Sequence, residues 1–432
     1  MNGITRISVK GFKSIAEERS IEIRPLTILA GANSSGKTSI MQPLLMMKQT
    51  LDATYDPGPI LIEGPNIKFT LIDQFLSKVN NNLVDAFKIE IEVDKTNYMS
   101  EVFRRNPESG IDVEEINYFD NKTLTFKLRP FMEQNEIIAA MPKEFYGNFK
   151  KMNFQFRIER KRFFLKAIGT SSGKEIGSGI TFDPGPDLNK YIENIQKIIH
   201  LPALRGNPER TYKTVGVGVG PLFLGRFENY IASIINHWKS IQDPRLQMLA
   251  TNLELLGLTW KVEIRPVNDT NAEILVGRLI HKKDKDFEDF VSIADVGYGV
   301  SQTLPILVAL LVAEPGQLVF IEQPEIHIHP KAQTAMSQIL ADAAQRGVNV
   351  VVETHSSLLL LGIQSLVAEN RLPCKKVMLH WFERRENDGI TDVSSTELDD
   401  AGAFGNWPED FADVQLNADI RFIRASESHL EE

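Results

Sequence analysis

The 432-residue sequence predicts an α/β fold in which a mixed, largely parallel sheet is flanked by helices. A strand-like run at 26–30 leads through a glycine-containing loop into an apolar helix at 39–51. From about residue 290 to 365, helical and buried-strand patterns alternate, as the crossovers of a parallel sheet require. No heptad repeat occurs, so we expect no long coiled coil.

The composition is that of a globular chain, with 42% hydrophobic and 24% charged residues. The apolar stretch at 304–313 is far shorter than the ~20 residues that span a bilayer, and the N-terminus lacks the apolar core of a signal peptide. Cys374 is the single cysteine, which excludes an internal disulfide and suits a reducing compartment. We therefore expect a cytoplasmic protein without membrane contact.

Hydrophobic periodicity and composition divide the chain into three regions. Residues 1–51 and 200–370 carry the strand and helix patterns of one head domain. Residues 52–199 turn to polar segments, prolines and short β-like runs, which predicts an inserted α+β lobe. Residues 371–432 are expected to form a C-terminal module with an acidic tail.

The segment 31-GANSSGKT-38 has the spacing of a phosphate-binding loop. In such a loop backbone N–H groups surround the phosphates, Lys37 reaches the β and γ oxygens, and the Thr38 hydroxyl ligates magnesium. The strand before it and the helix after it fit, because a helix N-terminus attracts anions; a glycine-serine surface turn is the alternative. The residues expected at the nucleotide are Asn33, Ser34, Ser35, Gly36, Lys37, Thr38 and Ser39.

A buried strand at 319–321 ends in an acid, Glu322. Parallel sheets place ligands at the carboxyl ends of their strands, so we expect this carboxylate to hold magnesium through water. The next residue, Gln323, cannot take a proton, whereas Glu325 lies two positions further on and can.

Two further segments are ambiguous by themselves. In 295–314, two glycines and Ser301 precede a long apolar helix, which is either a second anion site or a plain capped helix. In 348–361, an apolar strand ends in Thr354 and His355, and a lone histidine at a strand end is more often structural than catalytic.

Basic residues gather in 157-RIERKRFFLK-166, where they interleave with Phe163 and Phe164. The net charge of −9 argues against a uniformly basic nucleic-acid surface, although a local patch can still bind phosphate. The segment is therefore either a strand pair with one solvated face or a DNA contact.

The order of these motifs is that of an ABC-type ATPase head. The segments 11-GFKS-14, 31–40 and 322-EQPEIHIHP-330 resemble the SMC/RecF/OLD branch of that superfamily. The segments 201-LPALRGNPERTY-212 and 405-GNWPEDFAD-413 resemble, more narrowly, bacterial predicted ATPases related to OLD proteins. Relatives in that group include the ATPase subunits of the anti-phage systems Septu and PARIS.

The resemblance implies an ABC-type head that binds ATP and Mg²⁺, with Lys37 and Thr38 in the phosphate loop and Glu322 as the magnesium acid. It further implies that a signature segment contacts the γ-phosphate bound to the other subunit, so that ATP is sandwiched in a homodimer or larger oligomer. The signature would be Gly297, Gly299, Ser301 and Gln302; the other implied residues are His355 as the switch histidine, Lys13 near the nucleotide, Gln74 as the glutamine after the phosphate loop, and 327–330 as the coupling loop.

Two departures from the family pattern bear on function. Gln323 stands where ABC heads place the catalytic glutamate, and because a general base contributes about 10²–10⁴-fold, slow turnover is expected. Phosphoryl transfer depends mostly on positioning, however, and Glu325 is a candidate substitute. The residues after His355 lack the Glu…Asp-x-Asp cluster of the Toprim nuclease of OLD proteins, so an effector is expected to act in trans.

Three functions remain open from the sequence. The leading hypothesis is a regulatory ATPase that controls a separate effector, a nuclease of HNH or Toprim type in anti-phage defence. The second is a DNA-repair or chromosome-maintenance ATPase that acts on DNA directly. The third is an ATP-gated scaffold that does not hydrolyse its nucleotide. An ABC transporter motor is disfavoured, because the FKS start belongs to the DNA-associated branch.

Overall fold

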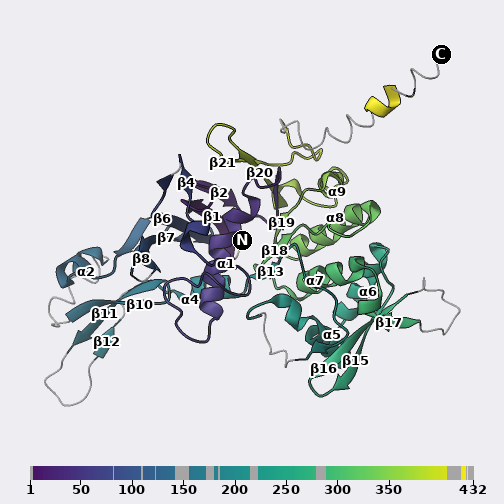
Figure 1. The fold of residues 1–432 in the computed structure, drawn as a ribbon, viewed down its shortest axis with the longest axis horizontal. Helices are drawn as coiled ribbons and strands as arrows, with labels where there is room; N and C mark the ends of the chain where they lie inside the picture. Colours follow the sequence, from purple (N-terminus) through teal and green to yellow (C-terminus); the bar gives the residue numbers. More distant parts are fainter. Residues whose placement is uncertain are drawn as a thin grey trace.

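The computed structural model describes residues 3–80, 82–108, 110–121, 123–141, 155–171, 180–182, 185–214, 222–278, 289–405, 420–424 and 426. Two six-stranded sheets dominate these residues, and helix α1 (Lys37–Asp52) lies between them (Figure 1). The described residues contain no helix that is both long and apolar enough to cross a membrane. The segment 406–413 of the resemblance lies outside the described residues.

The central sheet carries the phosphate loop. Its strands, in spatial order, are β13 (Ile199–Leu201), β18 (Leu318–Glu322), β19 (Asn349–Glu353), β3 (Leu26–Gly31), β20 (Val377–Arg384) and β21 (Thr391–Thr396). All neighbours are parallel except β20 and β21. The register pairs Glu322 with Glu353 and Glu353 with Leu29, so these strands end at one edge. The expected mixed α/β fold is confirmed.

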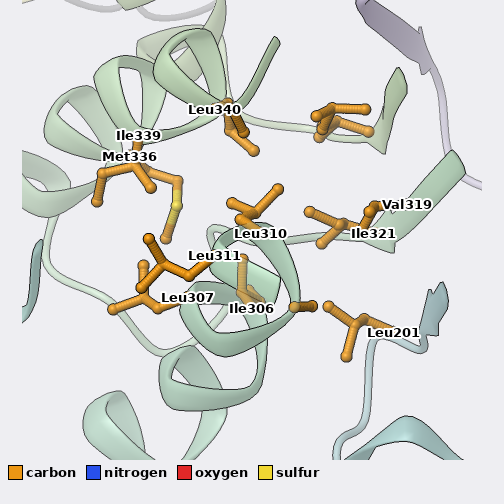
Figure 2. Close-up of a cluster of buried hydrophobic side chains, with 14 of the residues drawn as sticks. Leu201, Ile306, Leu307, Leu310, Leu311, Val319, Ile321, Met336, Ile339 and Leu340 are labelled. Carbon is orange, nitrogen blue, oxygen red and sulfur yellow. The ribbon is translucent and has the colours of Figure 1, made fainter. Parts of the chain in front are cut away.

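The two faces of this sheet have separate cores, because successive side chains of a buried strand point to opposite sides. Leu29, Phe320 and Val351 face α1 and the second sheet. Ile28 and Ile321 face the other way, toward three helices that pack on that side (Figure 2). These helices are α7 (Tyr298–Val312), α8 (Pro330–Gln345) and α9 (Ser357–Ala368).

The second sheet is antiparallel and joins regions that the sequence texture separates. Its strands are, in order, β2 (Arg19–Glu22), β1 (Ile4–Lys10), β6 (Ala86–Val93), β7 (Asn97–Asn106), β8 (Gly110–Asp120) and β9 (Thr123–Leu128). Ile7 pairs with Ile91, across the expected boundary at residue 52, and β20 and β21 cross the one at 371. Composition reports how polar a segment is but not which strand it pairs with.

Smaller elements surround the two sheets. The strands are β4 (Lys78–Val79), β5 (Asn82–Leu83), β10 (Gln155–Lys161), β11 (Phe164–Ser171), β12 (Ile180–Phe182), β14 (Tyr212–Lys213), β15 (Val262–Asn268), β16 (Asn271–Gly277) and β17 (Phe290–Ser292). The helices are α2 (Gln134–Ala140), α4 (Asn189–Gln196), α5 (Ile231–Ser240) and α6 (Arg245–Leu255), with 3-10 turns η1 (Ile72–Gln74), η2 (Phe227–Tyr230), η3 (Ile293–Asp295) and η4 (Cys374–Lys376). The longest helices in the described parts, α1 and α8, have 16 residues each, so no long coiled coil occurs there.

Glu101 of β7 is buried in the apolar core of the second sheet. Its exposure is 0%, neither carboxylate oxygen has a hydrogen-bond partner among the described residues, and its cross-strand neighbours are Ile89 and Ile116. Burial raises the pKa of this carboxyl well above its ordinary value, because the charged form is poorly solvated there. The folded state therefore holds a proton that the unfolded chain releases.

We predict that Glu101→Gln stabilises the protein at pH 8. Stability of the wild type falls as pH rises above the ordinary glutamate value of 4.5, where the unfolded state ionises first. The thermal midpoint of the variant should exceed that of the wild type by about 2–4 °C or more at pH 8, and the gap should close near pH 4.5. Melts of the exposed Glu108→Gln variant provide the control, and a gap that does not change with pH would contradict the prediction.

Candidate nucleotide-binding site

The phosphate loop has the backbone that anion binding requires. Ser34 and Gly36 have positive φ angles of 62° and 103°, and α1 begins at Lys37. A Cβ at Gly36 would lie 2.6 Å from the Thr391 hydroxyl and 2.9 Å from the Ser14 hydroxyl, so only glycine fits. The loop therefore presents its N–H groups at the start of α1, where the helix dipole also attracts an anion.

Lys37 is folded back on the loop. Its ammonium donates to the carbonyls of Gly31 and Ala32 at 3.1 and 2.7 Å, and the side chain is buried. Burial lowers the pKa of Lys37, while Glu353 and Glu325 act against that shift. These carbonyl bonds can be exchanged for phosphate oxygens, while Asn33 and Ser34 remain exposed at the tip of the loop.

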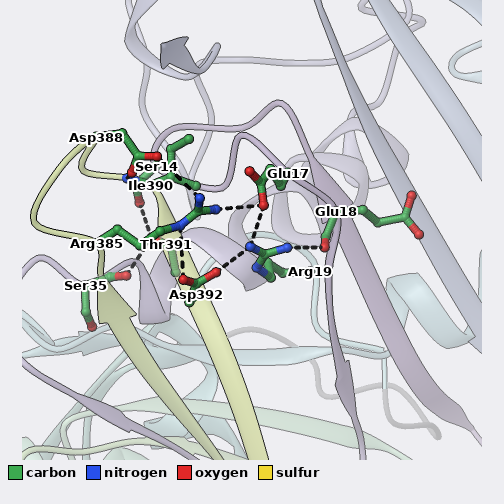
Figure 3. Close-up of polar contacts among 10 residues, drawn as sticks. All are labelled: Ser14, Glu17, Glu18, Arg19, Ser35, Arg385, Asp388, Ile390, Thr391 and Asp392. Carbon is green, nitrogen blue, oxygen red and sulfur yellow. Dashed lines mark hydrogen bonds and ion pairs between the residues drawn. The ribbon is translucent and has the colours of Figure 1, made fainter. Parts of the chain in front are cut away.

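Thr391 of β21 supports the loop from the side (Figure 3). It is fully buried, its hydroxyl lies 2.7 Å from the Ser35 carbonyl and 2.8 Å from the Ser14 hydroxyl, and its N–H donates to the Ser14 carbonyl. Arg385 anchors the same turn through ion pairs to Glu17, Asp388 and Asp392. Sequence analysis missed Thr391, because no local motif marks it.

A carboxylate outside the predicted set contacts Thr38, the threonine expected to ligate magnesium. The Thr38 hydroxyl donates to Glu353 Oε2 at 2.7 Å, and Glu353 is only 5% exposed. The pKa of Glu353 is raised to about 7: burial is the main cause and the charge of Glu322 adds to it, whereas the bond from Thr38 and the charge of Lys37 oppose the shift. The sequence does carry a signal for Glu353, because it is an acid at the end of a buried strand, two residues before His355.

Glu322, the residue assigned to magnesium, has other partners. Its Oε1 lies 2.9 Å from His200 Nε2, and its Oε2 accepts the Ala203 N–H at 3.1 Å. The reason is the strand order, because β19 lies between β18 and β3 and brings Glu353 one strand nearer to Thr38. The role of Glu322 as the magnesium acid therefore stays a prediction.

Glu325 is a buried carboxylate beside the switch histidine. Its Oε1 accepts the backbone N–H of His355 at 2.7 Å, and burial raises its pKa. Burial and the charge of Lys37 lower the pKa of His355. Gln323 has a positive φ of 45°, and its N–H donates to the Glu353 carbonyl at 2.7 Å, so the chain turns sharply after β18. That turn places Glu325 close enough for its charge to act on Lys37.

Lys13 and Gln74 come from adjacent segments. The Lys13 N–H donates to the Phe75 carbonyl at 2.7 Å, and its ammonium lies 4.8 Å from the centre of the Phe69 ring. Burial lowers the pKa of Lys13, while the charge of Glu322 opposes that shift. The Gln74 side chain accepts the Thr70 N–H at 2.8 Å and so caps its own turn.

The signature segment lies on the other face of the sheet from α1, because α7 belongs to the opposite core. Gly297 caps α7, the Ser301 hydroxyl donates to the Tyr298 carbonyl at 3.1 Å, and Gln302 Nε2 donates to the Gly206 carbonyl at 2.7 Å. A Cβ at Gly299 would lie 3.3 Å from the carbonyl of His327, in the expected coupling loop. The signature therefore contacts residues 206 and 327 and not the phosphate loop of its own chain.

The basic segment 157–166 is largely occupied by internal contacts. Arg157 pairs with Glu159 and Arg160 with Asp56. Arg162 donates from its guanidinium to the carbonyls of Leu51 and Ala53, both at 2.6 Å, and so closes the C-terminal end of α1. Phe163 and Phe164 are buried. These contacts favour the solvated strand pair; the DNA contact stays a prediction.

The oxygen ligands at the loop suit Mg²⁺. The described residues contain no group of three or more His, Cys, Asp or Glu side chains arranged to hold a metal ion. Magnesium in nucleotide sites is commonly held by one or two carboxylates together with substrate phosphates, so a complete protein cage is not needed. Thr38, with Glu353 bonded to its hydroxyl, fits that pattern.

A family model described as "AAA domain, putative AbiEii toxin, Type IV TA system" matches residues 26–361, which include the phosphate loop, the signature and the switch histidine. The chain belongs to this AAA family. It is an ATPase of the AAA type, which is consistent with the expected place in the SMC/RecF/OLD branch of ABC-type ATPases. The Old nuclease of Escherichia phage P2 is 20% identical over 378 residues.

That match covers 83% of this AAA ATPase and 57% of the Old nuclease, so the chain spans little more than half the length of that relative. An SMC head bound to the C-winged helix domain of ScpA is 13% identical, with 92% and 99% of the two chains covered and a TM-score of 0.48. The SMC head domain from Thermotoga maritima is 11% identical, with 92% and 100% covered and a TM-score of 0.41. The family assignment rests on the AAA model and not on these structures.

We predict that Thr391→Val weakens ATP binding by about 3–10-fold. The substitution keeps the side-chain shape but removes the hydroxyl that contacts the Ser35 carbonyl, and such a bond contributes about 0.5–1.5 kcal/mol. Titration of a fluorescent ATP analogue measures the affinity. Thr396→Val, at the far end of β21, is the matched control, and equal effects of the two variants would disprove the support role of Thr391.

We predict that Glu353→Gln raises the Mg²⁺ concentration needed for tight ATP binding by about 10–100-fold, as loss of an outer-shell partner does. In the wild type this requirement should also rise as pH falls below about 7, because Glu353 becomes protonated there. Calorimetric ATP titrations at several Mg²⁺ concentrations and pH values measure both effects. The exposed Glu383→Gln variant should keep the wild-type pH profile, whereas a pH dependence that survives in Glu353→Gln would assign it to another group.

Proposed function

We propose that this AAA ATPase is a nucleotide-driven switch in which two copies close head to tail around ATP and control a separate effector. The effector is a nuclease of HNH or Toprim type, and the system serves anti-phage defence in the cytoplasm. ATP favours the closed pair because it binds that state more tightly, and hydrolysis releases it.

One observation carries the dimer proposal. The phosphate loop and the signature segment begin helices α1 and α7, which cover opposite faces of the central sheet. Gly297 and Tyr298 are exposed at the start of α7, and no contact joins them to Lys37 or Thr38 in the described residues. In a head-to-tail pair, each copy supplies its signature to the phosphate loop of the other copy. Both phosphate loops and both signatures are then used within the pair, so the assembly is complete with two copies.

Glu325 is the residue that we propose as the base for hydrolysis. It is a buried carboxylate within electrostatic reach of Lys37, and its raised pKa brings it closer to the range of a useful base. Gln323 can orient a water by hydrogen bonding but cannot accept its proton. Turnover is therefore slow, which suits a switch that must persist long enough to be read by an effector.

The nuclease link is supported by the similarity to the Old nuclease, of which this chain spans 57%. An activity located in the remaining part of that relative would be supplied here by a partner. Direct action on DNA has less support, because the arginines at 157, 160 and 162 are bound to acids or backbone carbonyls.

Single-turnover hydrolysis and light scattering with ATP test the switch together. We expect the wild type to dimerise with ATP and release ADP slowly, Lys37→Ala to lose both, and Glu325→Gln to dimerise but cleave about 10²–10⁴-fold more slowly. Gln323→Glu should cleave faster than the wild type. Glu383→Gln, an exposed substitution on β20, is the matched carboxylate control.

Each alternative function predicts a different result in this experiment. ADP release that is absent in the wild type and in Gln323→Glu would establish a scaffold. Turnover that DNA stimulates, and that charge reversal at Arg157 abolishes, would establish an ATPase acting on DNA. A monomer in the presence of ATP would disprove the head-to-tail pair.

A further inference from the structure

A buried arginine, Arg205, connects helix α7, where the signature lies, to strand β18, which ends in Glu322. Arg205 lies in the irregular segment between β13 and β14 and is only 7% exposed. Its Nη2 donates to the carbonyls of Glu322 at 2.5 Å and Gln323 at 3.3 Å, and its Nη1 donates to the carbonyl of Gln302 at 3.3 Å. One guanidinium therefore contacts the signature and both residues at the end of β18.

The side chain of Gln302 is committed to the same segment. Its Oε1 accepts the Arg205 N–H at 3.2 Å, and its Nε2 donates to the Gly206 carbonyl at 2.7 Å. The Ala203 N–H donates to Glu322 Oε2, so this segment also holds the acid of the catalytic strand. These bonds connect α7 at Gln302, through Arg205, to the backbone at Glu322 and Gln323.

The environment of Arg205 lets it adopt more than one arrangement. No carboxylate is hydrogen-bonded to its guanidinium in the described residues, and its Nε has no hydrogen-bond partner there. A cavity of about 50 Å³ lies beside it, lined among others by Glu228, Ser301 and Leu304, and the Oε2 atom of Glu228 is likewise unpartnered. The charges of Glu228, Glu322 and Glu325 act on Arg205, but its guanidinium hydrogen bonds go to carbonyls. Because burying a charge costs free energy, an apolar side chain would serve a purely structural role better.

We propose that Arg205 is a positioning residue that relays engagement of the signature to the carboxyl end of β18 in the same chain. The proposal rests on the head-to-tail pair described above. When Ser301 and the start of α7 contact the nucleotide held by the second copy, Arg205 shifts the carbonyls of Glu322 and Gln323. That shift orients Gln323 and Glu325 in the chain's own site, so that the two sites of the pair act together.

A double-mutant cycle between Arg205→Met and Ser301→Ala tests the relay through single-turnover ATP cleavage. At protein concentrations low enough to keep the chain monomeric, both variants should bind ATP within about threefold of the wild type, because neither residue contacts the phosphate loop of its own chain. Each should slow cleavage by about tenfold or more, as small misplacements of reacting groups do. The double variant should be no slower than the slower single variant, because both substitutions interrupt one relay.

Arg205→Lys and Arg265→Met complete the design. Lysine keeps the charge but has no planar fork to hold several carbonyls at once, so an intermediate rate is expected; it also serves if Arg205→Met does not fold. Arg265 is exposed on β15 and should have the wild-type rate. Rate losses of Arg205 and Ser301 that multiply would show that Arg205 only braces the fold and would overturn the relay. If Ser301→Ala is fully active and ATP drives no dimer, the proposed pair fails instead.

Discussion

The in-register pairing of β18 with β19 is the constraint on which the rest of the site depends. It places Glu322 and Glu353 side by side at one edge of a parallel sheet, where two carboxylates repel each other unless each is separately stabilised. Glu353 receives the Thr38 hydroxyl, and Glu322 receives His200 and the Ala203 N–H. The phosphate loop and the 200–206 segment are thus each tied to one acid of the same pair.

This division of partners gives the two faces of the sheet different tasks. The face of α1 carries the phosphate loop with Lys37 and Thr38, where we propose that the nucleotide binds, and the face of α7 carries the signature. The proposed link between them lies at the sheet edge, because Arg205 reaches from Gln302 to the backbone at Glu322 and Gln323. A parallel sheet suits this arrangement, since all its strand ends carry their side chains and carbonyls to one side.

The elements with strong local patterns were predictable from the sequence, and the contacts between distant segments were not. The strand at 26–30, the loop at 31–38 and the apolar helix after the signature follow from periodicity and glycine spacing, and the structure has them nearly as expected. The pairing of β1 with β6 and of β3 with β20 leaves no local trace, so the expected domain boundaries cut through both sheets.

The candidate site shows the same limit at single residues. Lys37, Thr38, Glu325 and His355 come together as the motifs imply, because each motif ends a strand of one sheet or follows it. Glu353 was visible as an acid at a strand end, but its partner could be known only from the strand order. Thr391 carries no sequence signal, since a threonine in a strand is an ordinary residue. Arg205 lies in the segment 201–212, which resembles OLD-related ATPases, but that resemblance implied no role for the arginine.

The support of the phosphate loop by β21 has a consequence for biosynthesis. Thr391 lies 356 positions after Ser35, and β3 is sandwiched between β19 and β20, which are both made late. At ~5–20 residues per second the ribosome takes on the order of tens of seconds between the two segments, and β3 has no neighbouring strand to pair with until β19 is made. Long-range parallel pairing also forms slowly. A nascent chain therefore has the phosphate-loop motif long before it has the strands and the Thr391 support that hold that loop in place.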